Sequence, residues 1–325
     1  MALPVITISA GDPAGIGPEV IVKALITGKP ADCCQPVVVG SLELISKTLK
    51  DCSSDWQAIS ISDLSQAGSG HGLIDVLDIG ELDLRQVATG KACEESGRAN
   101  GIWLRTAADL VQRGDAGATV MGPVNSESLK LAKVALGDML GMEPGKRYLS
   151  LLSGPLRVVH IFDHVYLQDV CRLISEDIVL NAIEDTHRSM EQWGMKRPRI
   201  AVAGLNPHAN GPQENDAIIP AIKKAKDSGI KVEGPISPDT VFRQAIEGKH
   251  DIVIAMFHDQ GHIAIKTWGF AGNCALFLGA AYPFLSVGHG TAYDIAGKGI
   301  AQPDMMLSAI LQGASLAAGN GFLSR

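Results

Sequence analysis

The feature that most constrains the fold is the alternation of short apolar runs with longer segments of helical period. Strands buried on both faces are continuous apolar runs, and the crossovers that join parallel strands are usually helices. The alternation therefore predicts an α/β fold with a largely parallel sheet. The predicted strands are residues 4–9, 37–39, 119–121, 149–152, 157–162, 199–203 and 251–257, and the clearest predicted helices are residues 96–113, 176–193 and 216–228.

Length and charge narrow the functional classes. A chain of 325 residues predicts about two domains, and Gly122 with Pro123 is the first candidate boundary. Acidic residues outnumber basic ones by 35 to 28, so the net field repels phosphate backbones and anionic membranes. No apolar run approaches the roughly 20 residues that span a bilayer. We therefore expect a cytoplasmic protein with a small-molecule substrate, and neither nucleic acid nor a membrane as partner.

Histidines follow three of the predicted strands. LRVVHIFDH ends at His164, RIAVAGLNPH ends at His208, and DIVIAMFHDQG contains His258. Ligands of open α/β sheets bind outside the carboxyl ends of the strands, and neutral imidazole is the commonest protein ligand of metals. Three imidazoles with one open position form a catalytic type of metal site. The other interpretation is three separate histidines, each hydrogen-bonded locally.

The remaining histidines that we considered are weaker ligand candidates. His160 lies inside a predicted strand, so we expect it to be packed in the core. Three others lie in polar surroundings, where we expect them to be solvated: His71, His187 and His250.

Two glycine-rich segments could bind a nucleotide. GDPAGIGPE, residues 11–19, permits a tight turn into a helix whose free N–H groups could hold an anion, although a plain strand-to-helix connector fits equally. SVGHGTAYDIAGKGIAQP, residues 286–303, predicts an irregular loop around Asp294. A carboxylate there could accept hydrogen bonds from the ribose hydroxyls of NAD, and it would repel the 2′-phosphate of NADP. The other interpretation is a surface loop with a capping aspartate.

These segments also resemble a known family. HGTAYDIAGKGIAQP is similar to the adenosine-binding loop of the isopropylmalate and isocitrate dehydrogenases, in which an Asp-Ile pair marks NAD users. GDPAGIGPE, LNPHA, GPISPDT and HDQGHIAIK together resemble the 4-hydroxythreonine-4-phosphate dehydrogenase (PdxA) family, which shares that fold. The resemblance implies two α/β domains with an interdomain cleft. Residues 1–124 with 288–325 would bind NAD, and residues 125–287 would bind metal and substrate and form the dimer.

The resemblance implies a divalent metal on His164, His208 and His258, with the third ligand supplied by the partner subunit. The active site would then lie at the interface of a homodimer. Three imidazoles favour zinc over magnesium, which prefers oxygen, while manganese and cobalt are also admissible.

The resemblance also implies the other site residues. Asp239 and Asp259 would line the substrate and metal site, and Lys266 would contact an anionic group of the substrate. The NAD-binding residues would be Gly290, Ala292, Asp294 and Ile295.

The sequence departs from the family where the phosphate of its substrate binds. KVALGDMLGMEPG, residues 133–145, replaces a Gly-His-Thr-Glu stretch, and the family's Asn and Arg beyond Lys266 are Ala275 and Phe284 here. Asn125-Ser126 replaces a pair that ends in lysine. A phosphate dianion needs charge-assisted donors, so these changes favour a non-phosphorylated substrate. The pattern, with SVGHG for SVDHG, is closer to the terephthalate cis-dihydrodiol dehydrogenase branch, although Ala281 replaces an arginine of that branch.

The predicted function is NAD- and metal-dependent oxidation of the secondary alcohol of a hydroxy acid or diol carboxylate, with decarboxylation. A divalent metal lowers the pKa of a chelated alcohol and polarises the new ketone, and NAD accepts the hydride. Lys266 would pair with a carboxylate, and Asp239 or Asp259 would orient a water or relay the proton. The alternatives are oxidation of 4-phosphooxy-L-threonine for pyridoxal phosphate synthesis, a non-catalytic nucleotide- and metal-binding homologue, and a metal-dependent hydrolase.

Overall fold

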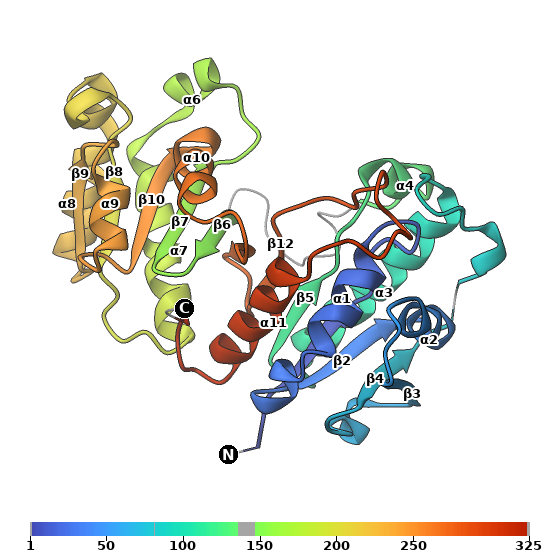
Figure 1. Ribbon diagram of the computed structural model, residues 1–325. Coiled ribbons are helices and arrows are strands. Elements are labelled where there is room, and N and C mark those ends of the chain that lie inside the picture. Colours follow the sequence, from blue (N-terminus) through green and yellow to red (C-terminus); the bar gives the residue numbers. More distant parts are fainter. Residues whose placement is uncertain (1, 81, 136–146, 324–325) are drawn as a thin grey trace. The chain divides into compact units, whose positions relative to one another are not determined.

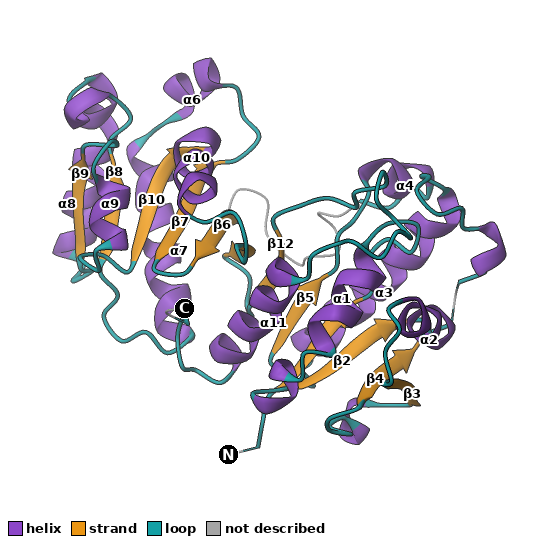
Figure 2. Cartoon of the chain, viewed as in Figure 1, coloured by secondary structure: helices purple, strands orange, loops and turns teal. Residues whose placement is uncertain are grey.

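The strands and helices of this chain divide into two α/β units. The computed structural model describes residues 2–80, 82–135 and 147–323 (Figure 1). The first unit contains Met1–Gly141 and Ala281–Ala318, and the second contains Met142–Ala280 and Gly319–Arg325. In each unit the strands form a sheet with helices packed against it (Figure 2).

The first unit contains a parallel sheet with the strand order β3-β4-β2-β1-β5-β12. Its strands are β1 (Val5–Ser9), β2 (Gln35–Gly40), β3 (Gln57–Ile61), β4 (Leu73–Asp78), β5 (Ala118–Met121) and β12 (Phe284–Val287). Its helices are α1 (Gly17–Leu25), α2 (Leu42–Asp51), α3 (Glu94–Gln112), α4 (Ser126–Leu131) and α11 (Asp304–Ala317).

Helices cover both faces of this sheet, as the alternation of side chains along β5 shows. Thr119 points toward α3, because its hydroxyl lies 2.7 Å from that of Thr7, which in turn bonds the carbonyl of Ala107 in α3. Its neighbours Ala118 and Val120 contact α11 at Gly313. Successive side chains of a strand point to opposite faces, so α3 and α11 cover opposite faces.

The second unit contains a mixed sheet with the strand order β11-β6-β7-β10-β8-β9. Strand β6 is antiparallel to both of its neighbours, and the other pairs are parallel. The strands are β6 (Tyr148–Ser153), β7 (Leu156–Phe162), β8 (Ile200–Ala203), β9 (Val232–Ile236), β10 (Ile252–Phe257) and β11 (Cys274–Leu278). The helices are α6 (Leu167–Leu173), α7 (Glu176–Gln192), α8 (Ile219–Asp227), α9 (Val241–Ile246) and α10 (His258–Trp268).

One hydrophobic core lies under α9 and α10 in the second unit. It joins apolar side chains of β6, β7, β8, β10 and β11 to Val241 and Ala245 of α9 and Ile265 of α10. In β7 the side chains on this face are Leu156 and Val158. The next residue on the same face is His160, which is fully buried. The apolar row therefore ends in an imidazole under α10.

The predicted α/β class is confirmed, and each predicted strand and helix matches an observed element. The helix expected over residues 216–228 begins with one π turn, Glu214–Ile218, before α8. Five strands escaped prediction because edge position or flanking glycines and prolines broke the apolar pattern: β3, β4, β9, β11 and β12. The expectation that His250 is solvated was wrong, because that side chain is buried and bonds Gln244.

The boundaries of the two units differ from those expected. Strand β12 pairs with β5 and α4 packs on α3, so both belong to the first unit rather than the second. The last residues belong to the second unit, where Gly321 donates to the carbonyl of Trp193 and Arg157 lies over the ring of Phe322. No helix of the described segments is both long and apolar enough to cross a membrane.

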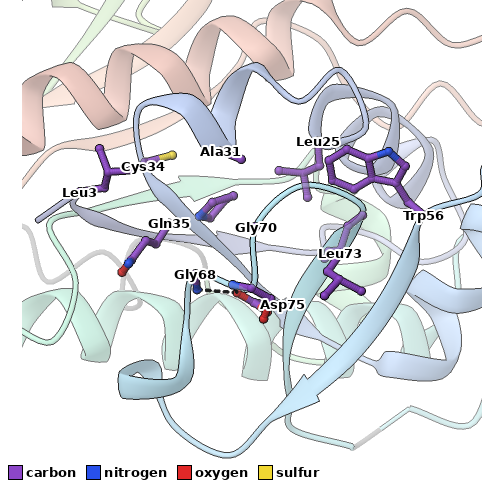
Figure 3. A pocket seen from close by; sticks show the side chains of 13 residues that line it. Leu3, Leu25, Ala31, Cys34, Gln35, Trp56, Gly68, Gly70, Leu73 and Asp75 are labelled. Atoms are coloured by element: carbon purple, nitrogen blue, oxygen red, sulfur yellow. Dashed lines mark hydrogen bonds between the residues drawn. The ribbon is translucent and has the colours of Figure 1, made fainter.

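A pocket of about 100 Å³ lies in the first unit beside β2 and β4 (Figure 3). Its walls include the apolar side chains of Leu25, Trp56 and Leu73. Its one acidic group, Asp75, accepts hydrogen bonds from the N–H groups of Gly68 and Ser69. The Asp75 carboxylate therefore stabilises the turn of residues 68–70.

Replacing Gly97 by Ala should destabilise the first unit. A Cβ at this position of α3 would lie 1.9 Å from the carbonyl oxygen of Ser128, so α4 would have to move. At an exposed helix position the same change adds up to about 1 kcal/mol of stability. Here we expect a loss of about 2–3 kcal/mol in the free energy of unfolding, the cost of overpacking. Urea unfolding measures it, and a gain in stability would contradict the close contact of α3 and α4.

Candidate functional site

The register of two strands brings the first candidate groups together. Phe162 ends β7, Phe257 ends β10, and these two residues are partners in the parallel ladder. Asp163 and His164 follow the first strand, and His258 follows the second. One ligand atom from each of these three residues lies within 4.8 Å of the others. In the described part of the chain, this group is where a metal ion could be held.

Each of the two imidazoles is oriented by a carboxylate beside it in the sequence. His164 Nδ1 lies 3.1 Å from Asp163 Oδ2, and His258 Nδ1 lies 2.7 Å from Asp259 Oδ1. A carboxylate on Nδ1 fixes the tautomer and leaves the lone pair of Nε2 for a cation. The other oxygen of Asp163, Oδ1, is buried and has no hydrogen-bond partner among the described residues. An unpaired buried carboxylate oxygen beside two imidazoles fits a divalent cation.

A pocket of about 300 Å³ adjoins this group. Asp163, His164, His258 and Asp259 line its polar side, and residues 165–167 with Phe257 line its apolar side. A small polar substrate could therefore reach the imidazoles.

His208 lies in the loop that follows β8 and does not belong to the group of Asp163, His164 and His258. It is exposed, with a left-handed backbone at φ 58°. The buried carboxylate of Glu214 holds this loop by accepting hydrogen bonds from the N–H groups of Leu205 and Asn206. Burial opposes ionisation of Glu214, but the Asn206 and Leu205 donors outweigh it and lower its pKa. No motif or spacing in the sequence predicted this role of Glu214.

Two of the three expected catalytic residues lie on α10, and the third lies in the turn after β9. Asp259 contacts His258, as described above. Lys266 is exposed on α10, eight residues after His258. Asp239 is exposed in the turn after β9, where it accepts a hydrogen bond from Ser237 Oγ at 2.7 Å. The structure thus joins Asp259 to the two imidazoles, and it gives Asp239 a local contact only.

Two further imidazoles lie behind His258. His262, one turn later in α10, stacks on His258 with ring centroids 3.6 Å apart and planes 16° apart. His262 Nδ1 lies 3.2 Å from Nε2 of the buried His160. Burial lowers the pKa of His160 to about 3, and burial with the nearby His258 lowers that of His262 to about 4. His262 was not among the predicted site residues. Its spacing of four residues from His258, which places both side chains on one face of a helix, is the signal that could have indicated it.

In the first unit, the 288–301 loop packs on the turn after β1. Tyr293 donates a 2.8 Å hydrogen bond to the buried Asp12, and Ile16 N donates to the carbonyl of Thr291. Gly15 is required here, since a Cβ would lie 2.7 Å from that of Thr291. The predicted irregular loop is confirmed, and GDPAGIGPE is its support.

The four predicted NAD-binding residues lie in this loop. Gly290 and Asp294 are exposed, and Ile295 N closes a turn by donating to the carbonyl of Ala292. Among the described residues, no hydrogen bond or ion pair occupies the Asp294 carboxylate, so it is available to hydroxyl groups of a ligand. A nearby pocket of about 340 Å³ is lined by residues of both glycine-rich segments, including Gly15 and Lys298.

Comparison with known proteins shows the family of this chain. Residues 32–313 match the model of the "Pyridoxal phosphate biosynthetic protein PdxA" family. A Novosphingobium aromaticivorans protein named "Putative 4-hydroxythreonine-4-phosphate dehydrogenase" is 46% identical, with 98% of this chain and 96% of that protein covered. A Clostridium botulinum protein named "Putative D-threonate 4-phosphate dehydrogenase" is 34% identical, with 95% of each covered.

Solved structures of similar proteins indicate the same family. A 4-hydroxythreonine-4-phosphate dehydrogenase from Burkholderia phymatum is 34% identical, with a TM-score of 0.87 over 97% of this chain and 99% of the other. The chain belongs to the PdxA family. A terephthalate 1,2-cis-dihydrodiol dehydrogenase from Burkholderia xenovorans LB400 is 27% identical, with a TM-score of 0.70 over 97% and 98% of the two chains. The expected isocitrate dehydrogenase-like fold is confirmed, and family membership makes the chain a relative of dehydrogenases that act on alcohols.

Some of the positions at which the resemblance implies a departure from the family lie among the described residues. Ala275 belongs to the apolar core under α10, and Phe284 at the start of β12 is fully buried. Ala281 lies at the start of the second segment of the first unit. Most of the segment KVALGDMLGMEPG lies outside the described residues. Ala275 and Phe284, where the resemblance implies two polar side chains, are therefore buried and apolar in this chain.

The buried His160 predicts a pH dependence of stability. Its pKa of about 3 in the folded protein lies below the ordinary 6.5, so between these values the unfolded chain binds a proton that the folded chain does not. The free energy of unfolding should therefore fall as pH falls below 6.5, by up to about 1.4 kcal/mol per pH unit from this group.

The substitution His160→Asn tests whether His160 causes this pH dependence of the free energy of unfolding. The amide can still donate to the Leu149 carbonyl, which His160 Nδ1 contacts at 2.8 Å, but it does not titrate. Urea unfolding from about pH 7 to about pH 5 should show a shallower slope in the variant. Comparing slopes removes the constant cost of the substitution, and an unchanged slope would contradict the prediction.

Proposed function

We propose that this protein is an NAD-dependent and divalent-metal-dependent dehydrogenase that oxidises the secondary alcohol of a 4-phosphorylated hydroxy acid. The observation that carries the proposal is the group of Asp163, His164 and His258 at the ends of two parallel strands, in a chain of the PdxA family. The relatives named above as dehydrogenases of 4-hydroxythreonine 4-phosphate and D-threonate 4-phosphate support this substrate class.

His164 and His258 would hold the cation through Nε2, while Asp163 and Asp259 keep their rings in place. A bound divalent cation supplies a positive charge that favours the alkoxide and then polarises the ketone formed from it. Zinc, manganese and cobalt suit a donor set of imidazoles with a carboxylate better than magnesium does. In the folded protein, the two carboxylates also balance part of the added charge.

His208 would be the third imidazole, supplied in a homodimer by the partner subunit. This assignment is supported by the position of His208 outside the group formed by His164 and His258 of the same chain. We place the active site at the dimer interface on this ground, in a cytoplasmic enzyme.

The first unit would hold NAD through the 288–301 loop. Asp294, exposed and without a described hydrogen-bond partner, would accept hydrogen bonds from the ribose hydroxyls, and its charge would exclude NADP. Gly290, Ala292 and Ile295 would shape the loop around the nucleotide. Asp12 and Tyr293 would keep the loop on the turn after β1.

The chain's own residues would complete the reaction in the second unit. The ammonium group of Lys266, exposed on α10, would pair with an anionic group of the substrate. Asp259 or Asp239 would accept or relay the proton of the alcohol. Loss of CO₂ from the resulting keto acid would follow where the ketone lies β to a carboxylate.

A second candidate substrate class is a non-phosphorylated hydroxy acid or diol carboxylate. One observation favours it: Ala275 and Phe284 are apolar and buried. The resemblance noted in the sequence implies an asparagine and an arginine at these positions that would contact phosphate. A buried phosphate without such donors would be costly. The names of the relatives favour the phosphate ester, so an assay with both classes decides.

The variants His164→Ala and His258→Ala should each lose the bound divalent metal and NAD reduction together, because each removes one ligand. His208→Ala should do the same if it is the third ligand. His187→Ala, at a half-buried position in α7 outside the site, is the matched control and should retain both properties. The measurements are metal content by mass spectrometry and NADH absorbance, and full turnover by a metal-free His258→Ala protein would refute the metal site.

The substrate class is tested by NADH formation with 4-phosphooxy-L-threonine, D-threonate 4-phosphate and a cis-dihydrodiol dicarboxylate, each with zinc, manganese or cobalt. We expect turnover of a phosphate ester, and at least 10-fold lower kcat/KM when the phosphate is removed, equivalent to about 1.4 kcal/mol of transition-state binding. Turnover of the dicarboxylate alone would establish the second class. NADP should replace NAD poorly, and replacing Asp294 by Ala should reduce that discrimination.

A further inference from the structure

The imidazole of His262 has contacts that packing alone does not require. It lies on α10 one turn after His258, and the two rings stack at 3.6 Å. Behind it, His160 occupies a position on β7 that continues the apolar row of Leu156 and Val158. An aliphatic pair at these two positions would fill the same space without the cost of burying polar rings. The polar pair therefore needs another explanation.

His262 is not itself a ligand of the ion that His258 would hold. The planes of His258 and His262 are nearly parallel, at 16°, and the ring centroids are 3.6 Å apart. Nitrogen lone pairs lie in the plane of an imidazole ring, so the lone pairs of two stacked rings do not converge on one point. His262 can therefore act on that ion only through His258.

A chain of directional hydrogen bonds fixes the His262 ring. The Nδ1–H of the fully buried His160 donates to the carbonyl of Leu149 at 2.8 Å, so its Nε2 must be the acceptor. His262 Nδ1 lies 3.2 Å from that Nε2 and 3.2 Å from the carbonyl of His258, and both are acceptors. The proton of neutral His262 is therefore on Nδ1. The ring cannot rotate without breaking these bonds.

Gly261 makes this arrangement sterically feasible. A Cβ at this position would lie 2.3 Å from His160 Nε2 and 2.6 Å from Val158 Cγ1. Only glycine lets α10 approach β7 closely enough for His262 to reach His160. The glycine of HDQGH and the histidine after it thus serve one contact.

We infer that His262 is a positioning residue for the metal ligand His258. Its ring, anchored through His160 to the backbone of β6, holds one face of the His258 imidazole, while Asp259 holds the Nδ1 edge. His258 is then fixed in both tilt and rotation before a cation binds, so binding costs less ordering of the side chain. The inference rests on the proposed function, because it concerns the same metal site.

The test compares metal binding by the full-length wild-type protein and three variants. His262→Leu removes both the stacking ring and the hydrogen bond. His262→Phe keeps a flat ring and loses the hydrogen bond. Ile263→Ala, at an exposed neighbouring position on α10, is the matched control. The Kd for Zn²⁺ is measured by chelator competition, the visible spectrum of the Co²⁺ form reports ligand geometry, and thermal unfolding of the metal-free proteins reports folding.

We expect His262→Leu to weaken Zn²⁺ binding about 10-fold or more and to change the Co²⁺ spectrum, as loss of a partner of a metal-binding histidine commonly does. His262→Phe should bind Zn²⁺ more tightly than His262→Leu and more weakly than wild type, because it keeps the stacked ring and loses the hydrogen bond that anchors it. Ile263→Ala should equal wild type. A folded His262→Leu protein with wild-type affinity and spectrum would overturn the inference, as would a folded His262→Phe protein as weak as His262→Leu.

The two proposals fail in different ways. If the wild-type protein binds no divalent metal, the proposed function fails, and the inference with it. If the wild type binds metal and His262→Leu binds it equally well, the inference alone fails. For active protein, the expected signature in His262→Leu is a higher metal concentration at half-maximal turnover, with kcat largely restored at saturation, which a general loss of folding would not produce.

Discussion

The parallel pairing of β7 with β10 is the constraint on which the candidate metal site depends. Because Phe162 and Phe257 are partners in the ladder, the residues after them must leave the sheet side by side. Asp163, His164 and His258 then meet without any long loop to order. A shift of one residue in register would turn His160 away from α10 and separate the two imidazoles. The apolar core under α9 and α10 therefore fixes the site as well as the fold.

The sequence predicted the fold well because the relevant signals are local. Strands whose residues are nearly all buried are mostly apolar runs, and β1, β7 and β10 are of this kind. Strands such as β3 and β9 lie at the edges of their sheets, where alternation with exposed residues weakens the signal. The position of His258 beside His164 was also predictable, since both follow strands whose carboxyl ends meet at one edge.

The parts of the site that were missed depend on side-chain contacts that leave no periodic pattern in the sequence. Glu214 and the backbone that it holds are eight or nine residues apart, and His160 and His262 are separated by 102. Nothing in the sequence distinguishes a buried glutamate that accepts backbone hydrogen bonds from an exposed one. The role of Gly261 likewise follows only from the distance of a hypothetical Cβ to the His160 ring. Such roles arise from packing, which one sequence does not specify.

The choice between the two substrate classes depends partly on two positions that are buried and apolar in this chain. Ala275 contributes to the core of the second unit, and Phe284 is fully buried at the start of β12. An arginine at either position would have to carry its charge out of an apolar environment or pair with an anion there. A phosphorylated substrate would therefore need other cations, and the cation that we propose for this role is Lys266, which is exposed on α10 near His262. In the proposed function Lys266 would contact the anionic group of the substrate, and whether that group is a phosphate or a carboxylate distinguishes the two substrate classes.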